Sequence, residues 1–189
     1  MTIANAYQIA AAGGFPGTEA QWLASLSISS RIMFALADLL QGAAPEGESD
    51  IPWLVGNPSN RRPQLFLDAS RVAGPGDGVV IGLDQGDVNE GRSRDEIADT
   101  CRVQSTMPVV LTISMPRQPG DPPNWQLLDP FYVAAHSRIM ASPRNLGGLC
   151  QSIQSDGRAF PDPNLQACWL RLLYNVTYKT AESDVTVIR

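Results

Sequence analysis

The chain of 189 residues is poor in charged residues, and its small net charge is negative. Charged residues make up 17%, below the usual quarter, and the formal net charge is −5. Lys and Arg form no cluster, which excludes a protein that binds nucleic acid through a basic patch. No apolar run reaches the roughly 18 residues that span a bilayer, and the N-terminus lacks the basic segment of a signal peptide. We therefore expect neither a membrane partner nor secretion.

Residues that commonly carry chemistry are equally scarce. His136 is the single histidine, and the three cysteines, Cys101, Cys150 and Cys168, are widely spaced. A Ser/His/Asp or Cys/His centre would have to use His136, which lies in a helical pattern with no matching signature around it. Zinc sites need close pairs of ligands, which this spacing does not supply. The odd cysteine count favours reduced, buried thiols over disulfides. The sequence thus predicts no catalytic residue, no metal ligand and no cofactor.

The acidic residues select no site either. Asp84, Asp87 and Glu90 lack the spacing of a calcium loop, so a solvated loop is predicted there. A catalytic carboxylate pair would have to come from these three, Asp129 or Asp162, and nothing in their spacing favours any two.

The chain does have enough apolar residues, 43%, for a buried core, and its length suits one domain over residues 1–189. Sixteen glycines and 15 prolines predict irregular connections. We expect a flexible N-terminal arm at 1–17 and a long Pro/Gly-rich loop at 43–78, which could hold a short strand at 64–67.

Two segments have the pattern of amphipathic helices. Thr18 and Gln21 form a capping-box pattern before a helix predicted at 19–41. Asp129 can cap a second helix, with Pro130 in its first position, that runs to about residue 141. Its predicted inner face contains Phe131, Ala135 and Ile139, with Val133 and Met140 beside it.

Three segments read as strands: 79–83, 103–115 and 167–179. The last two alternate apolar and other residues, the period of a half-buried strand. Pro108 predicts an edge position or a bulge. Polar excursions are expected at 84–99 and 155–166. This order predicts an α+β fold, a mainly antiparallel sheet with two main helices packed on one face.

Several apolar residues have no predicted place in the core. Two tryptophans lie in Pro-rich loops, where they either pin the loop or anchor a partner. Others occupy the second face of the 167–179 strand or alternate in the C-terminal extension at 181–189. The predicted interface residues are Trp53, Trp125, Trp169, Leu173, Val185 and Val187.

One block of the chain resembles a known family. It runs from Asp129-Pro130 through the helix YVAAHSRIMAS and Leu146-Gly147-Gly148-Leu149 to the strand ending Tyr174-Asn175-Val176-Thr177-Tyr178-Lys179-Thr180. In this order the block resembles the tail terminator proteins of long-tailed bacteriophages. The resemblance implies a structural protein of the virion, made in the host cytoplasm. It would form a hexameric ring that caps the tail tube, stops tube polymerisation and meets the head-side connector. DNA would be only cargo passing through the lumen.

The long 43–78 stretch and the N-terminal arm depart from that family's pattern. Two alternatives therefore remain open. One is another phage neck or tail part, either a head-completion protein or a tube subunit. The other is a small enzyme using His136 or the acidic loop.

The alternation at 181–189 suggests that this extension adds a strand to a neighbouring subunit. Deletion of 181–189 is expected to weaken ring formation, as measured by size exclusion with light scattering. An unchanged hexamer would contradict this hypothesis.

Overall fold

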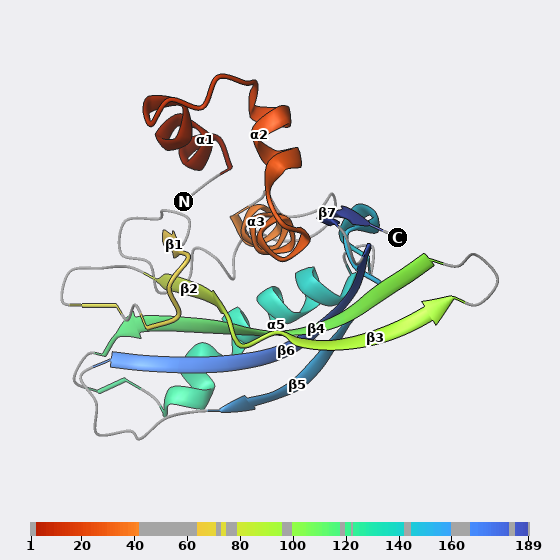
Figure 1. Cartoon of the computed structure of the whole chain (residues 1–189). Helices are drawn as coiled ribbons and strands as arrows, with labels where there is room; N and C mark the ends of the chain where they lie inside the picture. Colours follow the sequence, from red (N-terminus) through yellow and green to blue (C-terminus); the bar gives the residue numbers. More distant parts are fainter. Residues whose placement is uncertain are drawn as a thin grey trace.

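A computed structural model describes residues 3–41, 64–70, 73–74, 79–95, 100–117, 120–121, 123–141, 145–159, 167–181 and 184–188. Within them, a seven-stranded sheet carries helices on one face, so the α+β prediction is confirmed (Figure 1). The helices are α1 (Ile3–Ala12), α2 (Glu19–Ser25), α3 (Ile28–Gln41) and α5 (Asn124–Ala141). The strands are β1 (Gln64–Phe66), β2 (Val80–Gln85), β3 (Asn89–Asp95), β4 (Thr100–Pro116), β5 (Ser152–Ala159), β6 (Ala167–Ala181) and β7 (Asp184–Ile188).

The sheet is built around the antiparallel pair β4 and β6. Along the other edge of β4, β2 and β3 lie end to end, and both pair directly with β4 in the antiparallel direction. Along the other edge of β6, β5 and β7 likewise both pair directly with β6 in the antiparallel direction. Among the described strands, only β1 is parallel to its neighbour, β2. The prediction of a mainly antiparallel sheet is therefore correct.

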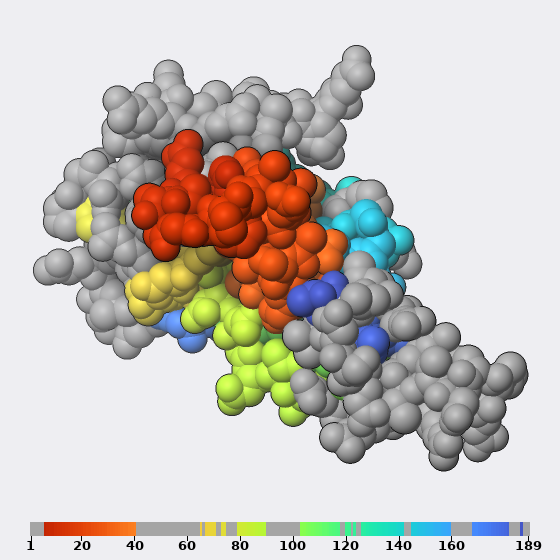
Figure 2. Space-filling view, turned by 45° about the horizontal axis from the view of Figure 1, so that its top comes forward, coloured from red at the N-terminus to blue at the C-terminus, as the bar shows by residue number. Residues whose placement is uncertain are grey.

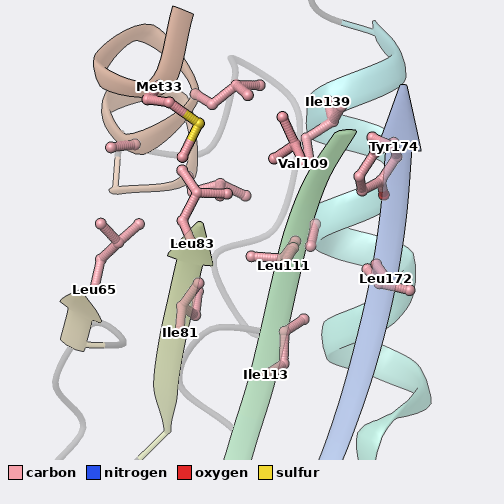
Figure 3. Close-up of a cluster of buried hydrophobic side chains, with 14 of the residues drawn as sticks. Met33, Leu65, Ile81, Leu83, Val109, Leu111, Ile113, Ile139, Leu172 and Tyr174 are labelled. Atoms are coloured by element: carbon pink, nitrogen blue, oxygen red, sulfur yellow. The ribbon is translucent and has the colours of Figure 1, made fainter. Parts of the chain in front are cut away.

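The core lies between this sheet and the helices α3 and α5 (Figure 3). The predicted alternation is confirmed in β4 and β6, because every second residue from Ser105 to Met115 and from Cys168 to Thr180 faces the helices and is buried. The register places Leu111 between Leu83 and Leu172, which forms one apolar row across three strands. On this side, the buried apolar residues of β2, β4 and β6 are Ile81, Leu83, Met107, Val109, Leu111, Ile113, Met115, Cys168, Leu170, Leu172, Tyr174, Val176 and Tyr178. The burial of Cys168 and Cys150 as free cysteines agrees with the predicted thiols.

The helix predicted at 19–41 is in fact two helices. The Thr18–Gln21 capping box begins α2, as predicted, but Leu26 has an extended backbone and ends it. The Ser27 hydroxyl then accepts a hydrogen bond from the Ser30 N–H and so caps α3. Serine side chains compete with helical hydrogen bonds and favour caps, and this segment has four serines between residues 25 and 30.

The segment predicted as a loose arm, 1–17, contains helix α1 over Ile3–Ala12. The physical reason is a contact that a local pattern does not reveal. The Tyr7 hydroxyl donates to the Gly17 carbonyl at 2.8 Å, and the Tyr7 ring lies 6.3 Å from the Trp22 ring. These contacts fold α1 back against α2.

Helix α5 begins at Asn124, five residues before the predicted Asp129 cap, so Pro130 lies inside the helix. The N–H groups of Gln126 and Leu127 bond to the Pro123 carbonyl. The additional turn buries Leu128 completely, which contributes about 1.5–3 kcal/mol. That gain is comparable to the roughly 3 kcal/mol that an internal proline costs. Phe131, Ala135 and Ile139 are buried as predicted, whereas Val133 is 52% exposed.

Two predicted polar excursions contain strands. β3 falls within 84–99, and β5 covers the first part of 155–166. Neither sequence alternates in hydrophobicity, but each lies along a longer strand, β4 or β6, whose free edge supplies backbone hydrogen bonds. Most of the predicted 43–78 loop lies outside the described residues, apart from β1 and short neighbouring pieces.

Pro108 lies in a central strand, so the edge alternative is wrong and the bulge alternative is correct. Gln85 pairs with Val109 and Asn89 pairs with Thr106. Between these pairs, the three residues 86–88 lie opposite the two residues 107–108. The Pro108 carbonyl accepts from the Gly86 N–H within this irregularity. The missing proline N–H therefore falls where the ladder is already interrupted.

The predicted Leu-Gly-Gly-Leu turn connects α5 to β5 as a short 3-10 helix, Leu146–Gly148. Its backbone is left-handed at Leu146, Gly147 and Gly148, with φ values of 47°, 71° and 97°. Two glycines remove most of the steric cost of this conformation. The Asn145 carbonyl accepts from the N–H groups of Gly148 and Cys150, while Leu146 and Leu149 pack against the core.

Residues 68–69 cross the helix-free face of β2 at Gly82. A Cβ at Gly82 would lie 2.9 Å from the Ala69 Cα and still closer to the Asp68 carbonyl oxygen. Both are backbone atoms, which cannot move aside as a side-chain tip can.

Gly82→Ala is therefore expected to destabilise the fold by about 1–3 kcal/mol, the cost of overpacking a filled core site. Urea denaturation followed by circular dichroism measures it. Gln154→Ala, at an exposed strand position, is the control and should change stability by less than about 0.5 kcal/mol. Equal stability of the two variants would contradict this close backbone approach.

Candidate interface on the helix-free face of the sheet

The face of the sheet opposite α3 and α5 is formed by the alternate residues of the same strands. On β6 these are Trp169, Arg171, Leu173, Asn175, Thr177 and Lys179, all partly or fully exposed. Leu173 pairs with Val110 of β4, and Trp169 pairs with Ser114. This face therefore has partly exposed apolar residues at the centre of the sheet, where a partner could bury them.

Trp169 and Arg171 contact each other on this face. The Arg171 guanidinium carbon lies 5.1 Å from the centre of the Trp169 ring. A cation over an aromatic face contributes about 0.5–1 kcal/mol at an exposed site. Because tryptophan and arginine are the residues that most often dominate binding energy at interfaces, this pair is the best candidate anchor on the face.

The β2 side of the same face is already covered by the chain. The Ala73 N–H donates to the Ser114 hydroxyl at 2.9 Å. Val80, Thr112 and Ser114 are each no more than 1% exposed, although they point away from the helices. The candidate interface is thus confined to the β6 half of the sheet, around Trp169, Leu173 and Val110.

Of the six predicted interface residues, the structure brings Trp169 and Leu173 together on one face of β6. Trp53 lies outside the described residues. Trp125 falls in the first turn of α5, and Val185 and Val187 fall in β7, but the side chains of these three are not described.

The described part of the extension at 181–189 pairs with its own chain. β7 pairs with the end of β6, and the Arg31 guanidinium donates to the Thr186 carbonyl at 3.3 Å. Deletion of 181–189 would therefore also remove a strand from the subunit itself, so loss of a hexamer must be compared with the thermal stability of the truncated chain.

A second cluster, which sequence reasoning missed, surrounds His136. The His136 ring is stacked between the rings of Tyr132, at 5.4 Å, and Tyr174, at 6.0 Å. Its Nδ1 lies 3.1 Å from the Tyr174 hydroxyl. The Arg158 guanidinium carbon lies 4.8 Å from the centre of the Tyr132 ring, and Arg158 is 3.8 Å from Asp129.

The His136 cluster joins α5, β5 and β6, and its two tyrosines, Tyr132 and Tyr174, are 42 positions apart in the sequence. The spacing of Tyr132 and His136, four apart on one helix, is the only local signal of it. Burial raises the pKa of Tyr174, so its hydroxyl stays protonated and available for the bond to His136. The contacts of the His136 cluster therefore fit a structural role, in which they hold α5 against β5 and β6.

The other candidates for chemistry are dispersed. Burial raises the pKa of Cys150 to about 11, so its thiol is protonated and a poor nucleophile near neutral pH. Asp84 and Asp87 are exposed at the end of β2, the Glu90 side chain is not described, and Asp162 lies outside the described residues. In the described part of the chain, no three His, Cys, Asp or Glu residues are grouped closely enough to hold a metal ion.

Comparison with models of known protein families finds no match, and comparison with curated proteins finds no significant match. No helix within the described ranges is long and apolar enough to cross a membrane.

Two buried hydroxyls on the covered side of this face provide a matched test. Ser114→Ala would leave the Ala73 N–H without its acceptor and is expected to cost about 1–3 kcal/mol. The Thr112 Oγ1 is buried with no hydrogen-bond partner among the described residues, so Thr112→Val should be neutral or stabilising by up to about 1 kcal/mol. Urea denaturation measures both, and a neutral Ser114→Ala would show that residue 73 does not cover this face.

Proposed function

We propose that this protein is a phage tail terminator, a structural subunit whose ring caps the tail tube and joins the tail to the head-side connector. The observation that carries the proposal is the asymmetry of the sheet. Two helices cover one face, and the β6 half of the other face retains partly exposed Trp169 and Leu173. A subunit of a closed ring needs such a surface, because each copy presents one patch to a different patch on its neighbour.

The order of elements along the chain gives further support. The helix, the left-handed Leu-Gly-Gly turn and the long strand of the resembling block are α5, Leu146–Gly148 and β6. Helix α5 packs directly on β6, and Leu146 and Leu149 pack against the same core, so the residues that carry the resemblance form a contiguous structural unit.

The acidic balance of the chain is also compatible with a ring around DNA. With a formal net charge of −5, the protein would tend to repel a phosphate backbone rather than bind it. If this acidic character extends to the central channel of the ring, DNA would pass through the channel without being retained. The partners in this proposal are other copies of the chain, the tube protein and a connector protein.

The proposal can be tested on the purified full-length protein. Negative-stain electron microscopy, together with light scattering, is expected to show discrete rings of a fixed number of subunits. Tubes of variable length would instead identify a tube subunit, and a monomer at all concentrations would contradict the ring.

The interface can be tested separately. Leu173→Glu places a charge where a partner would exclude water and is expected to reduce the ring fraction at least about tenfold at a fixed concentration. Val133→Glu is the matched control, because Val133 is an exposed apolar residue on α5, on the opposite side of the sheet. If rings form but both variants assemble like the wild type, the interface lies elsewhere although the ring proposal stands.

A further inference from the structure

Helices α1 and α2 form a unit, residues 3–25, that is held together by its own contacts. The Tyr7 hydroxyl bonds to the Gly17 carbonyl, and the Tyr7 and Trp22 rings lie 6.3 Å apart. The Thr18–Gln21 capping box closes the start of α2. We call this segment the N-terminal helical pair.

The N-terminal helical pair has almost no fully buried side chain among its described residues. Ala6, at 9%, is its most buried described side chain, and Ile9 is 63% exposed. By contrast, Ile28 and Ile32 in the first turns of α3 are completely buried. Each fully buried aliphatic side chain contributes about 1.5–3 kcal/mol, so α3 is held far more strongly than the pair.

The connection between the pair and α3 is short, and no backbone hydrogen bond of α2 or α3 crosses it. The Leu26 N–H bonds back to the Leu23 carbonyl in α2, while Ser27 caps α3 through its hydroxyl and carbonyl. The hydrogen bonds of each helix thus lie on their own side of Leu26–Ser27. A change in the backbone angles of these two residues leaves α3 intact.

An aromatic contact between Trp22 and Phe34 links the pair to α3. The Trp22 and Phe34 rings meet edge to face, with centroids 5.6 Å apart. Figure 1 shows α1 and α2 on the side of α3 that faces away from the sheet, and Figure 2 shows them at the molecular surface. Such a contact adds about 0.5–1.5 kcal/mol beyond its buried area, which is small compared with the stability of a domain.

We propose that the N-terminal helical pair detaches from α3 as one unit, by movement at Leu26–Ser27, while α3 and the sheet remain folded. Detachment exposes Trp22 on the pair and Phe34 on α3, and so presents an apolar surface that the closed subunit keeps partly covered. This device belongs to the single subunit and operates whether or not the chain forms a ring.

Hydrogen exchange followed by mass spectrometry on the full-length protein tests this proposal. Once detached, helices of 10 and 7 residues lose their hydrogen bonds, because isolated helices this short are marginal in water. Amides of residues 3–25 are expected to exchange together, with protection at least about tenfold below that of β4. Protection equal to that of β4, or clearly different protection in α1 and α2, would overturn it.

Two substitutions on α3 distinguish the stability of the N-terminal helical pair from that of the core. Phe34→Ala is expected to lower protection in residues 3–25 by roughly 3- to 10-fold, the size of an aromatic contact, without lowering it in β4. Leu39→Ala is the control, because Leu39 packs against the core; it should lower protection in β4 and leave residues 3–25 unchanged. If Phe34→Ala lowers both regions equally, the pair opens only with the whole domain, and the proposal fails.

Discussion

The pairing of β4 with β6 is the interaction on which the rest of the structure depends. The two strands run side by side from Arg102 opposite Ala181 to Pro116 opposite Ala167, without a register shift. Every other residue from Met107 to Met115 and from Cys168 to Tyr178 is apolar and faces the same side. A slip of one residue would turn all of these side chains to the opposite face, so hydrophobic burial fixes the register. Helices α3 and α5 then cover an apolar surface that this pairing has already defined.

This arrangement explains which elements the sequence predicts well. The alternation in 103–115 and 167–179 is repeated many times, and each repeat points to the same face. Phe131, Ala135 and Ile139 recur at helical spacing and occupy the expected side of α5. Where burial itself sets the pattern, the pattern can be read without the structure.

The elements that sequence reasoning missed depend on partners that are distant in the chain. β3 and β5 are polar strands that exist because β4 and β6 offer free edges. α1 depends on Tyr7 reaching Gly17 and Trp22, and the early start of α5 depends on a core site for Leu128. The His136 cluster draws on three elements. On the candidate interface, Trp169 and Leu173 could be predicted from alternation, whereas the cover over Thr112 and Ser114 could not, because it comes from residues with no pattern of their own.

The length of chain between β4 and β6 has a consequence for how this protein is made. The partners Leu111 and Leu172 are 61 positions apart, and contacts at such separation form slowly because a large loop must close first. During synthesis, the apolar side of β4 leaves the ribosome well before β6 exists. For that interval the strand with Met107, Val109, Leu111, Ile113 and Met115 has β2 and β3 on one edge and no partner on the other. An apolar strand with an open edge is the kind of segment that aggregates or engages chaperones. The yield of folded protein should therefore depend on how quickly translation reaches Ala181.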